Sequence, residues 1–111
     1  ARTASELDQI KTTLFKNFDV MMDAVRAGKD IAVADRLFYK YQSAQVARRC
    51  SDLVDELLLL AGARGIFTNN AMVRPWLDLK AARAHIANNA NGVGLTLGGS
   101  YLGAEIPDTF L

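Results

Sequence analysis

The sequence predicts an all-α protein, an antiparallel bundle of three long helices, because apolar residues recur at helical spacing and no strand pattern competes with them. The 111 residues include only two prolines, and proline is the residue that most strongly interrupts a helix. Half of the residues are hydrophobic and 23% are charged, a composition typical of a globular domain. We therefore expect residues 1–111 to form one helical domain.

The first predicted helix runs from Thr3 to Ala27. Its apolar residues follow one another in steps of three and four, which places them on one stripe of the helix. The stripe consists of Leu7, Ile10, Leu14, Phe18, Met21 and Val25. Gly28 is placed to end the helix, because glycine adopts the left-handed conformation at little steric cost. Phe15 and Phe18 form an aromatic edge, and its exposure would favour oligomerisation.

The second predicted helix runs from Asp30 to Ala61, with Asp30 or a neighbour as its N-cap. At about 1.5 Å per residue this rod is about 45 Å long and needs partners along its length. Its buried side is marked by Leu37, Tyr41, Ala44, Val54, Leu57 and Leu58. The run from Leu57 to Leu60 is apolar on every side, so we expect other helices to enclose this end.

The third predicted helix runs from Ala71 to Leu97, with Asn70 as its N-cap and Pro75 near its first turn, where a missing N–H is tolerated. Its stripe consists of Met72, Trp76, Leu79, Ile86, Val93 and Leu97. Bundles of such rods usually contain four helices. We therefore expect the fourth helix to come from missing N-terminal sequence or from another subunit.

Charge and composition exclude several classes of partner. Thirteen basic and twelve acidic residues leave a net charge of +1, and without a dense basic run this argues against nucleic acid. No apolar run approaches the ~18 residues that span a bilayer, so we expect no membrane association. Ala1 to Glu6 carries no apolar core of a secretory signal. We expect a cytoplasmic protein.

The single cysteine and the single histidine exclude an internal disulfide and argue against any metal site. Cys50 follows Arg49, and a neighbouring arginine lowers a thiol pKa. An inert thiol is nevertheless the expected state of Cys50.

His85 is the only histidine, and histidine readily exchanges a proton near neutral pH. On the predicted third helix it shares a face with small and polar residues, namely Asp78, Ala81, Ala82, Asn88 and Asn89. Asparagine is a poor helix former, so the pair Asn88–Asn89 inside a helix indicates a packing or binding reason. On the residues alone, the simpler interpretation of His85 is a solvated or hydrogen-bonded histidine in a bundle.

The loop from Ala61 to Gly65 separates two predicted helices. Its two glycines let the backbone approach a ligand closely, and Arg64 suits a phosphate or carboxylate. The loop lacks the complete spacing of a dinucleotide or phosphate-binding loop, so its secure role is to break the helix. Arg74 and Asp78, four residues apart, predict a surface ion pair. Trp76 between them is read as a core residue.

Three stretches carry a resemblance to a known family: Ala34-Asp35-Arg36-Leu37, then Leu60 to Phe67, then Asn70 to Ala81 followed by His85. From Ala32 to Gly103 the chain resembles the C-terminal helical domain of the acyl-CoA dehydrogenase superfamily. The closer likeness is to its monooxygenase branch, of the type of the p-hydroxyphenylacetate hydroxylase oxygenase component and dibenzothiophene monooxygenase. The family pattern has a proline where Ala71 stands and an arginine where Leu77 stands.

The resemblance implies a longer enzyme with an N-terminal helical domain, a central β-barrel and this C-terminal bundle. Such enzymes form homotetramers and bind flavin between domains, partly across subunits. Members of the monooxygenase branch receive reduced FMN or FAD from a separate flavin reductase and oxygenate an aromatic or related small molecule. This implies that the present chain is a fragment of such an enzyme and inactive by itself.

The resemblance also assigns roles to residues. His85 matches a histidine near flavin and substrate, which implies that it orients the substrate or the flavin or moves a proton. The residues expected to contact cofactor are Gly62, Ala63, Arg64, Gly65 and Asn70. Those expected to contact or support substrate are Arg74, Trp76, Asp78 and Asn89.

Two alternatives stay open. The first is an acyl-CoA dehydrogenase C-terminal domain, although no position clearly matches the carboxylate base of those enzymes. The second is a non-catalytic helical oligomerisation module, which would form a stable oligomer without affinity for flavin.

Overall fold

The computed structural model describes residues 1–67 and 69–107. Within these ranges every regular element is helical, so the predicted all-α class is confirmed. The elements are α1 (Arg2–Arg26), α2 (Val33–Leu60), the short 3-10 helix η1 (Gly62–Ile66), α3 (Val73–Ala84), the 3-10 turn η2 (Ile86–Asn88) and α4 (Ala90–Tyr101). None of the described helices is long and apolar enough to cross a bilayer.

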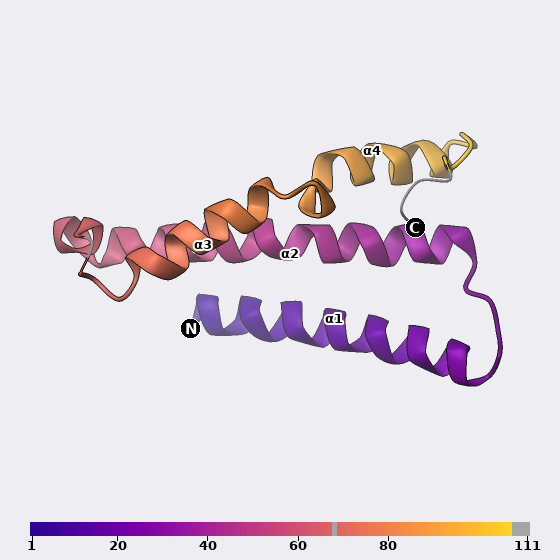
Figure 1. Cartoon of the computed structure of the whole chain (residues 1–111), viewed down its shortest axis with the longest axis horizontal. Coiled ribbons are helices and arrows are strands. Elements are labelled where there is room, and N and C mark those ends of the chain that lie inside the picture. The colour runs from indigo at the N-terminus through magenta and orange to yellow at the C-terminus, as the bar shows by residue number, and fades with distance from the viewer. Residues whose placement is uncertain (68, 108–111) are drawn as a thin grey trace.

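The long helix α2 is the axis on which the other helices pack. Figure 1 shows α1 along one side of α2, with α3 and α4 end to end along the other, and both layers run antiparallel to α2. The molecule measures 51 × 28 × 21 Å, and its radius of gyration is 17.0 Å. A compact chain of this length would have a radius of gyration of about 13 Å. The fold is therefore an elongated bundle with a thin core.

The contact between α1 and α2 is partly polar. Asn17 is buried, and its Nδ2 donates a hydrogen bond of 2.8 Å to Gln42 Oε1. Nearer the start of α1, Arg49 pairs with Glu6 at 2.6 Å. Ile10 is the buried apolar residue between these polar pairs. The side of α1 that faces α2 is thus rotated away from the stripe that the apolar pattern alone predicts.

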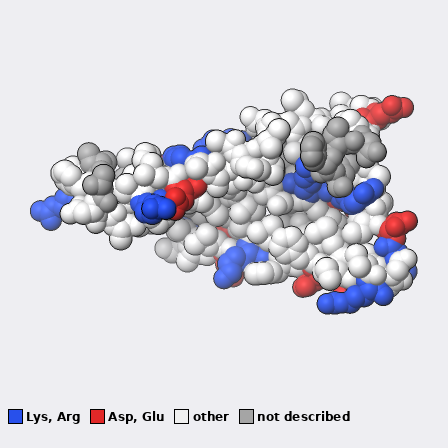
Figure 2. All heavy atoms as spheres, in the orientation of Figure 1, with Lys and Arg blue, Asp and Glu red and all other residues white. Residues whose placement is uncertain are grey.

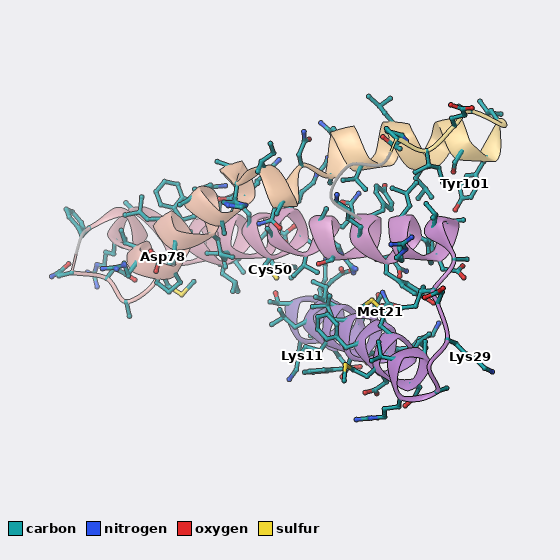
Figure 3. The ribbon with its side chains drawn as sticks, turned by 45° about the vertical axis from the view of Figure 1, so that its right-hand side comes forward. Lys11, Met21, Lys29, Cys50, Asp78 and Tyr101 are labelled. Carbon is teal, nitrogen blue, oxygen red and sulfur yellow. The ribbon has the colours of Figure 1, made fainter. Side chains whose placement is uncertain are left out.

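The rotation leaves a second apolar face of α1 outside. Phe18 and Val25, both predicted to be buried, are 48% and 65% exposed. Met21 lies on the α2 side of the helix in Figure 3. The exposed residues recur at steps of three and four, the spacing of a helix-packing seam: Phe15, Phe18, Met22 and Val25. We call these four residues the outer face of α1.

The glycines end helices as predicted, whereas the predicted caps do not form. Gly28 and Gly62 have φ values of 63° and 67°, in the left-handed region. α2 begins at Val33 without a side-chain cap, so the cap predicted at Asp30 is wrong. Asn70 Oδ1 accepts from the Met72 N–H at 2.9 Å, and this bond closes a turn just before α3 rather than capping the helix.

The leucine-rich end of α2 extends beyond α1 (Figure 1). Leu59 and Leu60 are 80% and 83% exposed. The described part of the chain therefore does not supply the enclosure predicted for this end. Figure 2 shows a surface on which uncharged atoms cover most of the viewed face, with the charged side chains in scattered groups.

The prediction of one continuous helix from Ala71 to Leu97 is wrong. The chain leaves the helix at His85, whose φ and ψ of −68° and 139° are extended, and α4 starts only after Asn89. We call residues 85–89 the break. Polar side chains compete with the helix for backbone hydrogen bonds, and the side chains of His85, Asn88 and Asn89 bond backbone groups here. His85 Nδ1 accepts from Ala87 N–H (3.2 Å), Asn88 Nδ2 donates to the Ala82 carbonyl (2.7 Å), and Asn89 Oδ1 accepts from Gly92 N–H (3.1 Å).

Helix α4 is rich in glycine, and packing on α2 holds it. A glycine inside a helix costs about 1 kcal/mol relative to alanine. Ala90 and Leu97 are buried, and Gly94 lies directly over an aromatic ring of α2. A Cβ at Gly94 would come within 2.9 Å of Tyr41 Cε2. The missing side chain at this position lets the two helices approach closely.

We expect Gly94→Ala to lower the free energy of unfolding by about 1 kcal/mol, because the added methyl overpacks the contact with the Tyr41 ring. Gly98→Ala is the matched control, since nothing lies within 4 Å of its Cβ position. It should raise the free energy of unfolding by about 0.5–1 kcal/mol through helix propensity. Urea unfolding followed by circular dichroism measures both, and equal stabilisation by the two alanines would show that the close contact is absent.

Candidate functional site

His85 lies at the break and faces a cleft of about 530 Å³. We call it the apolar cleft. α2 contributes Leu37, the break contributes Ile86 and Ala87, and α4 contributes Val93 to its wall. The segment after α4 also reaches the cleft. Its residues there are Ile106 and Pro107.

The hydrogen bond at His85 indicates which ring nitrogen carries the hydrogen in the neutral imidazole. Nδ1 accepts from the Ala87 N–H at 3.2 Å, so the neutral ring carries its hydrogen on Nε2. Within the described chain Nε2 has no hydrogen-bond partner. The imidazole is exposed, and its Nε2–H is available to donate to a bound molecule. Chemically, this group can orient an oxygen or nitrogen acceptor, or move a proton.

A second cleft, of about 390 Å³, is also lined by His85. We call it the basic cleft. Its polar lining comes from α2, α3, the break and the start of α4: Arg48, Arg83, His85, Asn88, Asn89 and Asn91. His85, Ile86 and Asn89 line both clefts. The structure therefore brings together His85 and Asn89, two of the residues that the sequence predicts for a site.

A polar clamp fixes α3 on α2 and so positions the break. Trp76 Nε1 donates to Asp55 Oδ1 at 2.6 Å, and Lys80 Nζ donates to Asp55 Oδ2 at 2.6 Å. Lys80 also donates to Ser51 Oγ at 3.0 Å, and Ser51 is fully buried. The hydrogen bond from Lys80, and after it the one from Trp76, holds the pKa of the Asp55 carboxyl below its ordinary value of 3.8. Trp76 is thus part of the helix contact, but it is only half-buried and α3 has no buried residue, which differs from the core position expected for it.

The other members of this clamp were not predicted from the sequence. On α3 they are Lys80 and Arg83, and Arg83 pairs with Asp52 of α2 at 3.2 Å. A signal was present, because Trp76, Lys80 and Arg83 follow at steps of four and three and share one face of a helix. The acidic partners on α2 are likewise close in sequence.

The predicted cofactor loop lies at the C-terminal end of α2, whereas the break between α3 and α4 lies beside the middle part of α2 (Figure 1). Arg48 lines a cleft with His85, whereas Gly65 packs on Leu58, and the ten residues of helix between Arg48 and Leu58 span about 15 Å. A Cβ at Gly65 would lie 3.1 Å from the Leu58 side chain and carbonyl, so this glycine serves packing. Asn70 Nδ2 donates to the Arg64 carbonyl at 3.2 Å. Within one chain the loop and His85 do not form a common site.

The remaining predicted residues lie outside both clefts. Arg74 Nε pairs with Asp78 at 3.1 Å, and the two side chains are 84% and 64% exposed. This is the predicted surface ion pair, and Figure 3 shows Asp78 on α3. Burial raises the pKa of the Cys50 thiol, which outweighs the lowering by Arg49, in keeping with an inert thiol. In the described ranges no group of three metal-ligating side chains occurs.

Comparisons with known proteins agree with this architecture. Residues 1–90 match the family model described as "Acyl-CoA dehydrogenase, C-terminal domain". A pigment production hydroxylase of Rhodococcus erythropolis is 25% identical over 104 residues, which cover 94% of this chain and 26% of that protein. The present chain therefore spans about a quarter of the length of this relative.

Two solved structures are similar to the chain over almost its whole length. The HsaA monooxygenase from M. tuberculosis has a TM-score of 0.88 at 25% identity, covering 98% of this chain and 29% of that one. XiaF from Streptomyces sp., solved in complex with FADH2 and glycerol, has a TM-score of 0.89 at 24% identity, covering 99% of this chain and 28% of that one. By its family match and its fold, the chain belongs to the acyl-CoA dehydrogenase C-terminal domain family.

Proposed function

We propose that this chain is the C-terminal helical domain of a flavin-dependent monooxygenase, which uses reduced flavin and O₂ to hydroxylate an aromatic or related small molecule. The observation that carries the proposal is the exposed Nε2–H of His85 at the apolar cleft. The names of two relatives, a pigment production hydroxylase and a monooxygenase, support the same activity.

The apolar cleft suits an aromatic ring system. Its volume of about 530 Å³ falls in the ~300–1,000 Å³ range of small-molecule sites, and such sites combine apolar walls with a few polar groups. When bound, reduced FMN or FAD supplies the oxygen chemistry. XiaF, which shares the fold, was solved with FADH2, and this supports a flavin here. His85 is the proposed catalytic residue, which orients the bound ring or moves a proton at Nε2.

We propose that the working enzyme is a homo-oligomer, and specifically a tetramer, with further domains that complete the site. The exposed outer face of α1 and the exposed Leu59 and Leu60 support burial against other chains or domains. In such an assembly the cofactor residues Gly62, Ala63, Arg64, Gly65 and Asn70 serve a site on a neighbouring subunit. A separate flavin reductase supplies reduced flavin in the cytoplasm.

The lining of the apolar cleft favours hydroxylation over acyl-CoA dehydrogenation. A dehydrogenase of this superfamily uses a carboxylate base, and in the described part of the chain no carboxylate lines either cleft. Arg74 and Asp78, which the resemblance implies contact or support the substrate, are exposed and lie outside both clefts. We propose them only as contacts to other parts of the enzyme.

The test uses the intact protein that contains this chain. It is mixed with a flavin reductase, NADH, FMN or FAD, and a panel of phenols, and oxygen uptake and product are measured. We expect a hydroxylated product formed in proportion to reduced flavin. Reduction of tightly bound FAD by an acyl-CoA would instead identify a dehydrogenase. Absence of any flavin binding would identify a non-catalytic module.

A further inference from the structure

The basic cleft has the chemistry of an anion site. Arg48 reaches it from α2, and Arg83 reaches it from α3. Within the described residues no carboxylate lines it. Two carboxylates of α2 lie near Arg83. Asp52 pairs with it at 3.2 Å and is itself 57% exposed, and the charge of Arg83 also acts on Asp55, whose own partner is Lys80. Arg83 is therefore offset by its ion pair, and the guanidinium of Arg48, which has no ion pair among the described residues, gives the cleft its net positive charge.

Several hydrogen-bond donors of the basic cleft are unused. The side chain of Arg48 makes no hydrogen bond or ion pair within the described residues, and the side chain of Asn91 makes none either. Asn89 Oδ1 accepts a hydrogen bond from the Gly92 N–H, and Asn89 Nδ2 remains available as a donor. A guanidinium group presents donors in a planar fork that matches the two oxygens of a carboxylate or phosphate. The cleft also holds two free acceptors, the amide oxygens of Asn88 and Asn91. The planar fork of Arg48 is the free group that an anion uses.

The two clefts meet at His85. His85, Ile86 and Asn89 line both of them, so a ligand whose ring lies in the apolar cleft has its polar end next to the basic one. The lining of the apolar cleft is mainly apolar, with Lys40, Asn89 and Thr96 as polar members besides His85. The basic cleft is lined mainly by two arginines and by side-chain amides. This division matches a molecule that is aromatic at one end and anionic at the other.

We propose that the basic cleft binds the carboxylate or phosphate group of an aromatic ligand held in the apolar cleft, with Arg48 as the residue that recognises the anion. The inference rests on the proposed function for the aromatic end of the ligand. Two sources supply this chemistry, namely an aromatic acid substrate and the phosphate of the flavin. Arg48 acts in binding and specificity. His85 keeps its proposed role at the aromatic end of the ligand, where it orients the ring or moves a proton.

The experiment measures dissociation constants on the intact protein with two matched ligand pairs. FMN and riboflavin differ by the phosphate, and 4-hydroxybenzoate and 4-hydroxybenzamide differ by the charge of the carboxylate. Arg48→Met removes the charge with little change in length, and Arg48→Lys keeps the charge without the fork. Arg74→Met is the control, because Arg74 is an exposed arginine outside both clefts.

We expect Arg48→Met to weaken the anionic member of one pair at least tenfold and to leave its neutral partner unchanged, with Arg48→Lys in between and Arg74→Met without effect. Loss confined to FMN identifies the flavin phosphate, and loss confined to 4-hydroxybenzoate identifies a substrate carboxylate. Equal effects on neutral and anionic members, or no effect on either pair, overturn the inference. If the wild-type protein binds flavin and hydroxylates normally, but Arg48→Met changes none of the dissociation constants, this anion site is refuted and the proposed function remains. Failure of the wild-type protein to bind any flavin would refute both.

Discussion

His85→Asn lowers the rate of hydroxylation by the intact enzyme about 10²–10⁴-fold, the usual contribution of a positioned acid–base group. Asparagine places an amide oxygen near the position of Nδ1, so the variant keeps an acceptor for the Ala87 N–H that His85 bonds at 3.2 Å. It lacks any group at the position of Nε2. The loss therefore reports on Nε2 and not on the geometry of the break.

His85→Gln separates the two roles of the imidazole. Its side-chain amide reaches the position of Nε2 and donates a hydrogen bond, but it does not exchange a proton near neutral pH. If His85 orients the ligand, this variant retains most of the wild-type rate. If His85 moves a proton, the rate falls as far as in His85→Asn. Full activity in both variants would remove His85 from the site. Rates are measured under single turnover with chemically reduced flavin, so that the reductase has no influence.

Asp55→Ala lowers the free energy of unfolding by about 1–2 kcal/mol at neutral pH, because it deprives both Trp76 Nε1 and Lys80 Nζ of their acceptor. The value lies low in the range for charged hydrogen bonds because the Asp55 side chain is 39% exposed. Asp78→Ala is the matched control, since its partner is an exposed arginine and such pairs contribute about 0.5 kcal/mol or less. Equal effects of the two variants in urea unfolding would show that the clamp does not hold α3.

The Asp55 contribution depends on pH in a defined direction. The hydrogen bond from Lys80, followed by that from Trp76, holds the folded pKa of Asp55 below its ordinary value of 3.8. The stabilisation is therefore complete above the ordinary pKa and is lost as the pH falls through the folded pKa. The stability difference between wild type and Asp55→Asn should stay constant from pH 7 to pH 5 and shrink below pH ~4. A difference that grows in acid would contradict the assignment.

Much of the fold follows from the sequence, because glycine positions and apolar spacing are local signals. Gly28 and Gly62 mark the helix ends correctly, and both have positive φ. The buried face of α1 is harder to predict from the sequence, because the apolar residues of α1 form two adjacent stripes. Which stripe is buried depends on Gln42 and Arg49 of α2, whose register against α1 no local pattern gives.

The break shows why apolar periodicity alone placed His85 inside a continuous helix instead of between two helices. Apolar spacing continues from Trp76 to Leu97, so it predicts one helix, yet the polar side chains at 85, 88 and 89 satisfy backbone groups in place of the helix. The unfavourable helix propensity of Asn88–Asn89 was the visible sign. The identity of His85 as a candidate follows from sequence, whereas its two clefts arise from contacts among α2, the break and α4.

The central claim is that the Nε2 of His85 faces a flavin-dependent reaction site, and a structure of the intact enzyme with reduced flavin bound tests it most directly. We expect the flavin ring, or an aromatic substrate stacked beside it, to lie in the apolar cleft with an acceptor atom about 3 Å from His85 Nε2. A flavin bound away from the break, with His85 surrounded by water in the complete assembly, would contradict it.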